Sequence, residues 1–493
     1  MIFIEIDTKH FESKVDYKID HMSAAEFITS KATYSYLLID TGAVKEEDVL
    51  TIIKNGRSRS ILYFGGKSEY HNFFEEFGHF NVDSLWQEKK IGMIEECARY
   101  FYQGQWAGPI APSEFGIISS MIPGKISRYG RYKLILSGDY GEEWITAITW
   151  NRSHQTWTQS LPPLRKLYSG GTFKLLFDYD KTEQLDVQFL VYFYYKNGTR
   201  ERSCITKKEA ILKIPKDTSI NLVLQIKGGG TFKLKKIYVT KDRGEYGYYL
   251  PGDKVEFTKR SEQICTYFVP GKKTEKLIVS FTGALNELYK FEYLSLSTLN
   301  YPVLYFQDNR ARGGAFMLGE ELNNEYEDAV INKILDIAKK LSIDKSDIIL
   351  NGYSMGSFSA LYYGTKIGVG HVIASKPIVF LGDVTKDADL IFSNDGMMTE
   401  ARLYLTGRTM EKDTKILNSI ICQTLEATHA VDTHYHLFVM KNDELDSKAG
   451  FFLKNILDKQ KLNFFLEEHE GKHGDKRIEM KKFIFSTIEK IDV

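Results

Sequence analysis

The hydrophobic pattern of the chain changes twice, and these changes divide it into three regions. In residues 1–118, short apolar runs at 36–39 and 61–64 have the length of buried strands. Apolar residues also recur there at helical spacing, as at Ile91, Ile94, Cys97, Ala98 and Phe101. This mixture predicts an N-terminal region of mixed α/β structure.

The second region, residues 119–245, has the pattern of β-structure throughout. Strand-like runs separated by turn residues occur at 133–136, 172–177, 187–195, 221–226 and 231–239. Asn197-Gly198 follows an aromatic strand and predicts a hairpin, because a tight turn needs positive φ. A glycine run at 227–230 separates the last two strand-like runs. The pattern predicts a β-sandwich, similar in texture to carbohydrate-binding modules.

Three tryptophans, Trp144, Trp150 and Trp157, lie early in this second region. Indole rings in a row can stack on sugars, but large aromatic side chains are more often buried. We therefore favour core or sheet-edge packing for them and keep a sugar platform as the alternative.

A polar stretch at 241–245 predicts a linker to the third region, residues 246–493. Strands expected at 276–281, 302–306, 347–350, 434–440 and 462–466 alternate with helices expected at 320–340, 451–457 and 476–491. Such alternation predicts a mainly parallel sheet that helices cover on both faces. The fold class is therefore α/β, with a C-terminal domain of the α/β-hydrolase type.

The motif G-x-S-x-G occurs as Gly352-Tyr353-Ser354-Met355-Gly356, between a short apolar strand and a helical pattern. In α/β-hydrolases this strand-to-helix turn is too tight for larger side chains near the nucleophile, and glycines meet that demand. The sequence therefore predicts Ser354 as a nucleophile, and we expect its side chain to be exposed.

A serine nucleophile needs a histidine base, which follows the last strand in this fold. His473 lies between two glycines after the strand expected at 462–466, whereas its rival His469 is still close to that strand. We therefore predict His473 as the base.

The acid that orients the base should follow the preceding strand, which is expected at 434–440. Asp443 and Glu444 both lie at a suitable offset, and Asp446 is next in line. The sequence leaves the choice between Asp443 and Glu444 open.

An oxyanion needs two N–H donors, one from the residue after the nucleophile and one from a loop after an earlier strand. Met355 supplies the first. The strand expected at 276–281 ends in a turn of small residues, so the second donor is predicted to be Thr282 or Gly283.

Composition excludes several classes of protein. Lys+Arg and Asp+Glu both total 65 among 493 residues, and this balance argues against a nucleic-acid partner. The four cysteines show no CxxC spacing, so neither a disulfide framework nor a zinc site is expected, and no metal is indicated. The acidic N-terminus and the lack of a long apolar run predict a cytoplasmic protein that reaches the membrane only through partners.

With these residues placed, the chain resembles the accessory secretory protein two family of the accessory Sec system. The resemblance rests on the β-rich middle region, the motif around Ser354, the turn at 440–443 and Gly471-Lys472-His473-Gly474. It implies partnership with accessory secretory proteins one and three and with the accessory SecA motor. It further implies export of serine-rich repeat glycoproteins and O-acetylation of GlcNAc on these adhesins.

Two alternatives remain to the acetyltransferase that this resemblance implies. The same residues would serve a carboxylesterase or deacetylase acting on glycans, and the chain can also be a non-catalytic scaffold of the export complex. No tightly bound cofactor is expected. The acetyl donor stays open, with acetyl-CoA as a candidate.

Overall fold

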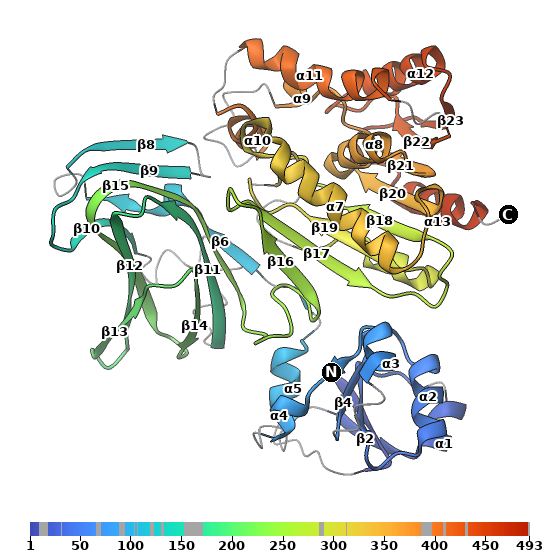
Figure 1. Cartoon of the computed structure of the whole chain (residues 1–493), viewed down its shortest axis with the longest axis horizontal. Coiled ribbons are helices and arrows are strands. Elements are labelled where there is room, and N and C mark those ends of the chain that lie inside the picture. Colours follow the sequence, from blue (N-terminus) through green and yellow to red (C-terminus); the bar gives the residue numbers. More distant parts are fainter. Residues whose placement is uncertain are drawn as a thin grey trace.

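The computed structural model arranges the chain around three β-sheets, which occupy separate parts of the molecule (Figure 1). The structure describes residues 1–8, 18–30, 32–65, 71–87, 94–102, 104–105, 107–118, 123–129, 133–151, 171–284, 290–311, 313–385, 397–407, 411–428 and 432–491. Within these residues, no helix is long and apolar enough to cross a membrane.

The N-terminal sheet has five parallel strands in the order β2-β1-β3-β4-β5. Its strands are β1 (Ile2–Ile6), β2 (Lys18–Met22), β3 (Tyr36–Asp40), β4 (Ile61–Phe64) and β5 (Phe80–Asn81). Its helices are α1 (Ala24–Thr29), α2 (Glu46–Asn55), α3 (His71–Glu76), α4 (Asp83–Gln87) and α5 (Ile94–Tyr100). One hydrophobic cluster lies on each face of the sheet. The strands predicted at 36–39 and 61–64 are confirmed as β3 and β4.

The middle sheet is antiparallel and folds over one hydrophobic core. Its strands are β6 (Ala107–Ile110), β7 (Gly116–Ile117), β8 (Lys125–Tyr129), β9 (Lys133–Asp139), β10 (Ile145–Asn151), β11 (Gly171–Lys181), β12 (Leu185–Tyr194), β13 (Arg200–Ile205), β14 (Glu209–Ile214) and β15 (Ser219–Lys241), with a short 3-10 helix η2 (Pro112–Glu114) after β6. Strands β6 and β7 pair with β15 and β10, so this sheet recruits strands from before residue 119. The division of the chain at residues 118 and 245 stays a prediction.

Strand β15 replaces the two strands expected at 221–226 and 231–239. It continues without interruption for 23 residues, including the glycine run, and links the two halves of the sandwich. Its first part pairs with β10 and β12, and its second part pairs with β6, β9 and β11. Gly228 has φ +87°, and a side chain there would collide with the Gln184 carbonyl. The glycines therefore bend one strand rather than separate two.

The tryptophans of this region differ in their surroundings. Trp150 is buried in the core of the sandwich, as favoured from the sequence. Trp144 is partly exposed, and the ammonium of Lys227 lies 5.0 Å from its ring centroid. Trp157 lies outside the described residues.

The segment predicted as a polar linker at 241–245 is instead a buried joint between regions. The guanidinium of Arg243, which is 1% exposed, donates hydrogen bonds to the carbonyl oxygens of Tyr100, Tyr102, Gly104 and Tyr249. The linker prediction was wrong because charge along a sequence does not show that carbonyl groups from distant segments converge on it.

The C-terminal sheet has eight strands in the order β16-β17-β19-β18-β20-β21-β22-β23, the arrangement of an α/β-hydrolase. The pairs β16–β17 and β17–β19 are antiparallel, and the remaining neighbouring pairs of this sheet are parallel. The strands are β16 (Asp253–Phe257), β17 (Gln263–Val269), β18 (Leu277–Phe281), β19 (Val303–Gln307), β20 (Ile348–Tyr353), β21 (His371–Ser375), β22 (His434–Met440) and β23 (Asn463–His469). The larger helices are α7 (Asn324–Lys340), α8 (Met355–Ile367), α10 (Met397–Thr406), α11 (Glu411–Glu426), α12 (Ala449–Lys459) and α13 (Arg477–Lys490). Separate hydrophobic clusters cover the two faces, which confirms the predicted architecture.

Helix α7 begins later than the helix predicted at 320–340. Glu321 and Leu322 have positive φ, which a regular helix excludes. The side chain of Asn323 then accepts the N–H of Tyr326 at 3.3 Å and caps α7.

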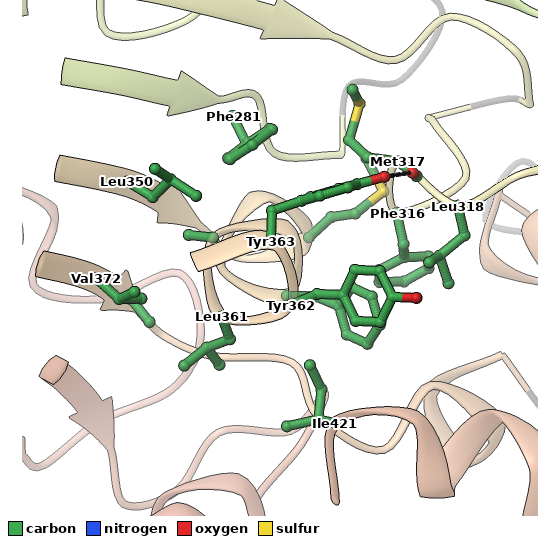
Figure 2. Packing of buried hydrophobic residues seen from close by; sticks show 14 of the residues in the cluster. Phe281, Phe316, Met317, Leu318, Leu350, Leu361, Tyr362, Tyr363, Val372 and Ile421 are labelled. Atoms are coloured by element: carbon green, nitrogen blue, oxygen red, sulfur yellow. Dashed lines mark hydrogen bonds between the residues drawn. The ribbon is translucent and has the colours of Figure 1, made fainter. Parts of the chain in front are cut away.

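Helix α8 is held against the sheet by close packing. Figure 2 shows Phe281, Leu350 and Val372, from three neighbouring strands of the sheet, facing Leu361 and Tyr363 of this helix. The Tyr363 hydroxyl donates to the Met317 carbonyl at 2.5 Å (Figure 2). This packing fixes the helix whose first residue follows Ser354.

We expect Arg243→Leu to lower the free energy of unfolding by about 3 kcal/mol, because four buried carbonyl groups lose a charged donor. Chemical denaturation measures this change. Arg202→Leu, at an exposed position on β13, is the control and should stay within about 0.5 kcal/mol. Equal free energies of unfolding for the two variants would contradict the conclusion that Arg243 stabilises a buried joint between the regions.

Candidate active site

Ser354 occupies a strained turn between β20 and α8. Its φ of 54° and ψ of −123° lie outside the regions that non-glycine residues prefer. A Cβ on Gly352 would collide with the Gly356 carbonyl, and one on Gly356 would collide with the Phe281 carbonyl. The two glycines of the motif are therefore a steric requirement of this turn.

The structure brings Ser354, His473 and Asp443 into one hydrogen-bonded chain. The Oγ of Ser354 lies 2.9 Å from Nε2 of His473, and Nδ1 of His473 lies 2.7 Å from Oδ2 of Asp443. The other carboxylate oxygen of Asp443 accepts the N–H of Leu445 at 2.9 Å. With the proton on Nδ1, His473 donates to Asp443 and accepts from the Ser354 hydroxyl, as a base for that hydroxyl must.

The neighbouring acids have other partners. Glu444 accepts the backbone N–H of His473 at 2.9 Å, and this bond lowers the pKa of the carboxyl. Asp446 accepts the N–H groups of Val379 and Phe380, both at 2.8 Å. Of the two acids that the sequence left open, Asp443 contacts the imidazole and Glu444 anchors its loop.

His469 does not join this group. It ends strand β23, hydrogen-bonds Glu467 at 2.7 Å and stacks on Phe438 with ring centroids 4.3 Å apart. The preference for His473 over His469 thus agrees with the geometry.

Lys376 is a site residue that the sequence did not reveal. It is fully buried directly after β21, and its ammonium donates to the carbonyl oxygens of His473, at 2.8 Å, and Asp475. Burial lowers the pKa of this lysine. The only signal in the sequence is a lysine within an otherwise apolar stretch after a strand.

The two candidates for the second oxyanion donor differ in their contacts. The N–H of Thr282 donates to the Phe306 carbonyl at 3.2 Å, so the sheet uses it. The N–H of Gly283 donates to Oε2 of Glu292 at 2.9 Å. Met355 is the first residue of α8, where backbone N–H groups lack partners within the helix. Gly283 and Met355 therefore remain the candidate donors, and Thr282 does not.

Ser354 is more enclosed than expected. It is 6% exposed, with His473 at 8% and Asp443 at 4%, whereas we had expected an exposed serine. The ring of Tyr353 stacks on His473 with centroids 5.7 Å apart and covers one side of the imidazole. A cavity of about 470 Å³ lies elsewhere, between the loop at 55–60 and segments near 267–272 and 294–300.

The sequence matches the accessory Sec system GspB-transporter family over residues 7–491. The chain belongs to this family. The match includes strands of all three sheets and is not limited to the hydrolase-type region.

Known relatives of this accessory Sec family member agree with the assignment. An accessory Sec system protein of Staphylococcus aureus is 25% identical over 389 residues, covering 76% of this chain and 70% of that protein. Another, from Streptococcus gordonii, is 22% identical over 392 residues, covering 78% of this chain and 74% of that protein. A chain in the solved Glycosylation Associate Protein (Gap123) complex of Streptococcus agalactiae has the same fold, with a TM-score of 0.80 and 19% identity over 100% of this chain and 98% of that chain.

We expect Gly356→Ala to lower the free energy of unfolding by about 2 kcal/mol, although alanine normally stabilises a helix relative to glycine. The new Cβ collides with the Phe281 carbonyl, which belongs to the sheet. Thermal unfolding measures the effect. Gly474→Ala is the control, because no atom lies within 4 Å of its Cβ position. A Gly356→Ala protein as stable as the native chain would contradict the close approach.

Proposed function

We propose that this accessory Sec family member is a serine-dependent O-acetyltransferase with GlcNAc on serine-rich repeat adhesins as its acceptor. The observation that carries the enzymatic part is the hydrogen-bonded chain from Ser354 through His473 to Asp443 at the elbow turn. The acceptor follows from the resemblance to the accessory secretory protein two family.

In the first step, Oγ of Ser354 attacks the acetyl carbonyl carbon of the donor while Nε2 of His473 takes the hydroxyl proton. The bond to the leaving group then breaks, and His473 returns the proton to that group. In the second step a sugar hydroxyl attacks the carbonyl carbon of the acetyl-serine and gives its proton to His473. The bond to Oγ of Ser354 then breaks, and His473 returns the proton to that oxygen. Acetyl-CoA is a candidate donor, and the chain needs no resident cofactor for these steps.

The enclosure of the site supports transfer over hydrolysis. An acetyl-enzyme survives until a sugar arrives only if bulk water is kept away from it. Ser354 and His473 are both buried, and Tyr353 stacks on the imidazole. A carboxylesterase or deacetylase would gain nothing from excluding water, which is its second substrate.

The second part of the proposal is a role in the export assembly. The similar chain in the Gap123 complex of Streptococcus agalactiae supports work as one subunit among several. We infer that the partners are accessory secretory proteins one and three, the accessory SecA motor and the adhesin itself. The protein would act in the cytoplasm and reach the membrane translocase through these partners.

We expect Ser354→Ala to lower kcat for the hydrolysis of p-nitrophenyl acetate by about 10³-fold or more. In cells, the variant should abolish acetylation of the adhesin glycan while export continues, because the hydroxyl serves chemistry and not assembly. Glycan mass spectrometry and the amount of exported adhesin measure the two roles separately. Unchanged acetylation in this variant would contradict the enzymatic proposal and favour the alternative of a non-catalytic scaffold of the export complex.

We expect the two neighbouring acids to differ in their effect on catalysis. Asp443→Asn should lower kcat about 10⁴-fold, because it favours the wrong tautomer of His473. Glu444→Ala should cost only about tenfold, the equivalent of one hydrogen bond to the His473 N–H. Steady-state kinetics with p-nitrophenyl acetate compares them, and a larger loss for Glu444→Ala would contradict the assignment of the acid.

A further inference from the structure

The carboxylate of Glu292 accepts a hydrogen bond from the backbone N–H of Gly283, which the proposed reaction needs as an oxyanion donor. The N–H of Gly283 donates to Oε2 of Glu292 at 2.9 Å. Gly283 lies beside the elbow, since a Cβ built on it would be 3.1 Å from the carbonyl oxygen of Tyr353. The register agrees, because Phe281 of β18 is paired with Gly352 of β20. The donor next to Ser354 is therefore already engaged by an acid.

We propose that Glu292 is a built-in plug of the oxyanion site, which holds the Gly283 N–H in the resting protein and must leave it before acyl transfer. This inference rests on the proposed acyl transfer at Ser354. It assigns to the same site a residue that controls when the site is competent.

The physical reason is competition between two anions for one donor. A carboxylate and the oxyanion of a tetrahedral intermediate are both negatively charged acceptors, and one N–H cannot serve both at full strength. Loss of a single oxyanion donor slows related reactions by about 10²–10³-fold. A remaining carboxylate would also repel the charge that develops in the transition state. Glu292 in its observed position thus opposes the reaction.

Glu292 is held in this position by its neighbours along the chain. On one side, Gln105 clamps Phe291, because its amide accepts the Phe291 N–H at 2.6 Å and donates to the Phe291 carbonyl at 3.1 Å. On the other side, the ring of Tyr293 packs edge-on against Tyr353, with centroids 6.4 Å apart. The plug is therefore fixed by contacts at both flanking residues.

The clamp connects the plug to the joint between regions. Gln105 follows Gly104, whose carbonyl accepts a hydrogen bond from Arg243 at 3.0 Å. The contacts thus run from Arg243 through Gly104 and Gln105 to Phe291 and Glu292. Any partner that moves the segment around residue 105 would loosen the hold on Glu292.

The environment of the carboxyl also allows it to leave. Burial raises the pKa of Glu292, while the hydrogen bond from the Gly283 N–H and the charges of Lys290 and Arg477 oppose this shift. Arg477 begins α13, just after the loop that carries His473. A cation on that side offers a released carboxylate an alternative partner.

Hydrolysis of p-nitrophenyl acetate tests the plug in the full-length protein. We expect Glu292→Gln, which keeps the shape and removes the charge, to raise kcat/KM about tenfold or more, since neutral hydrogen bonds are weaker than charged ones. Gln105→Ala should raise it as well, because it releases Phe291 while leaving the carboxylate in place. Glu183→Gln, on the exposed turn between β11 and β12, is the matched control and should leave the rate unchanged.

Combination with Ser354→Ala separates the two proposals. A gain in the Glu292→Gln protein that disappears in the double variant Glu292→Gln with Ser354→Ala supports both the plug and the nucleophile. A second outcome overturns the plug alone. In it, the native protein has a higher kcat/KM than Ser354→Ala, but neither Glu292→Gln nor Gln105→Ala exceeds the native value. Rates in all proteins equal to that of Ser354→Ala overturn the proposed acyl transfer and the plug with it. Should Glu292→Gln fail to fold, the direction of the Gln105→Ala effect decides.

Discussion

The candidate site depends on how closely helix α8 approaches strands β18 and β20. Backbone atoms of Gly356 and Phe281 meet where no side chain fits, and this contact turns the chain so sharply that Ser354 adopts a positive φ. Such a conformation costs about 1–3 kcal/mol and persists only where the surroundings impose it. Burial of nearly every side chain of α8 supplies that support. The turn places the serine hydroxyl at the carboxyl edge of the sheet, where the loops that follow β18, β22 and β23 begin.

Besides the stacking of Tyr353 on the imidazole, the histidine loop is held by polar contacts. Glu444 receives the N–H of His473, Lys376 binds its carbonyl, and Asp443 binds its ring. Three charged groups thus fix the backbone and the imidazole of a single residue. Hydrogen bonds to charged groups are stronger than those between neutral groups and suit the precise placement of one side chain.

Buried polar contacts and one long strand connect the three regions of the chain. Strand β15 connects both halves of the sandwich, and the buried Arg243 that follows it binds carbonyl groups from the segments on either side. The family match over residues 7–491 includes residues of all three regions. A hydrolase-type region inside an export protein would need such contacts if acyl transfer is to respond to assembly. Under the proposed plug, the hydrogen bonds that link Arg243 to Gly104 and Gln105 to Phe291 would give such a response a physical route.

The sequence by itself determined the features that depend on local spacing. The period of apolar residues placed the main strands, G-x-S-x-G marked the elbow, and the order of Ser354, Asp443 or Glu444, and His473 followed from the succession of strands. Only the tertiary structure shows that Asp443 and not Glu444 contacts the imidazole, because both lie on one turn and the path of the chain sets which carboxylate meets the ring. It likewise showed one strand at the glycine run, a buried joint at Arg243, and Lys376 and Glu292 beside the site. The reason is that periodicity records which side of an element is buried, whereas the partner of a buried charge comes from a distant part of the chain.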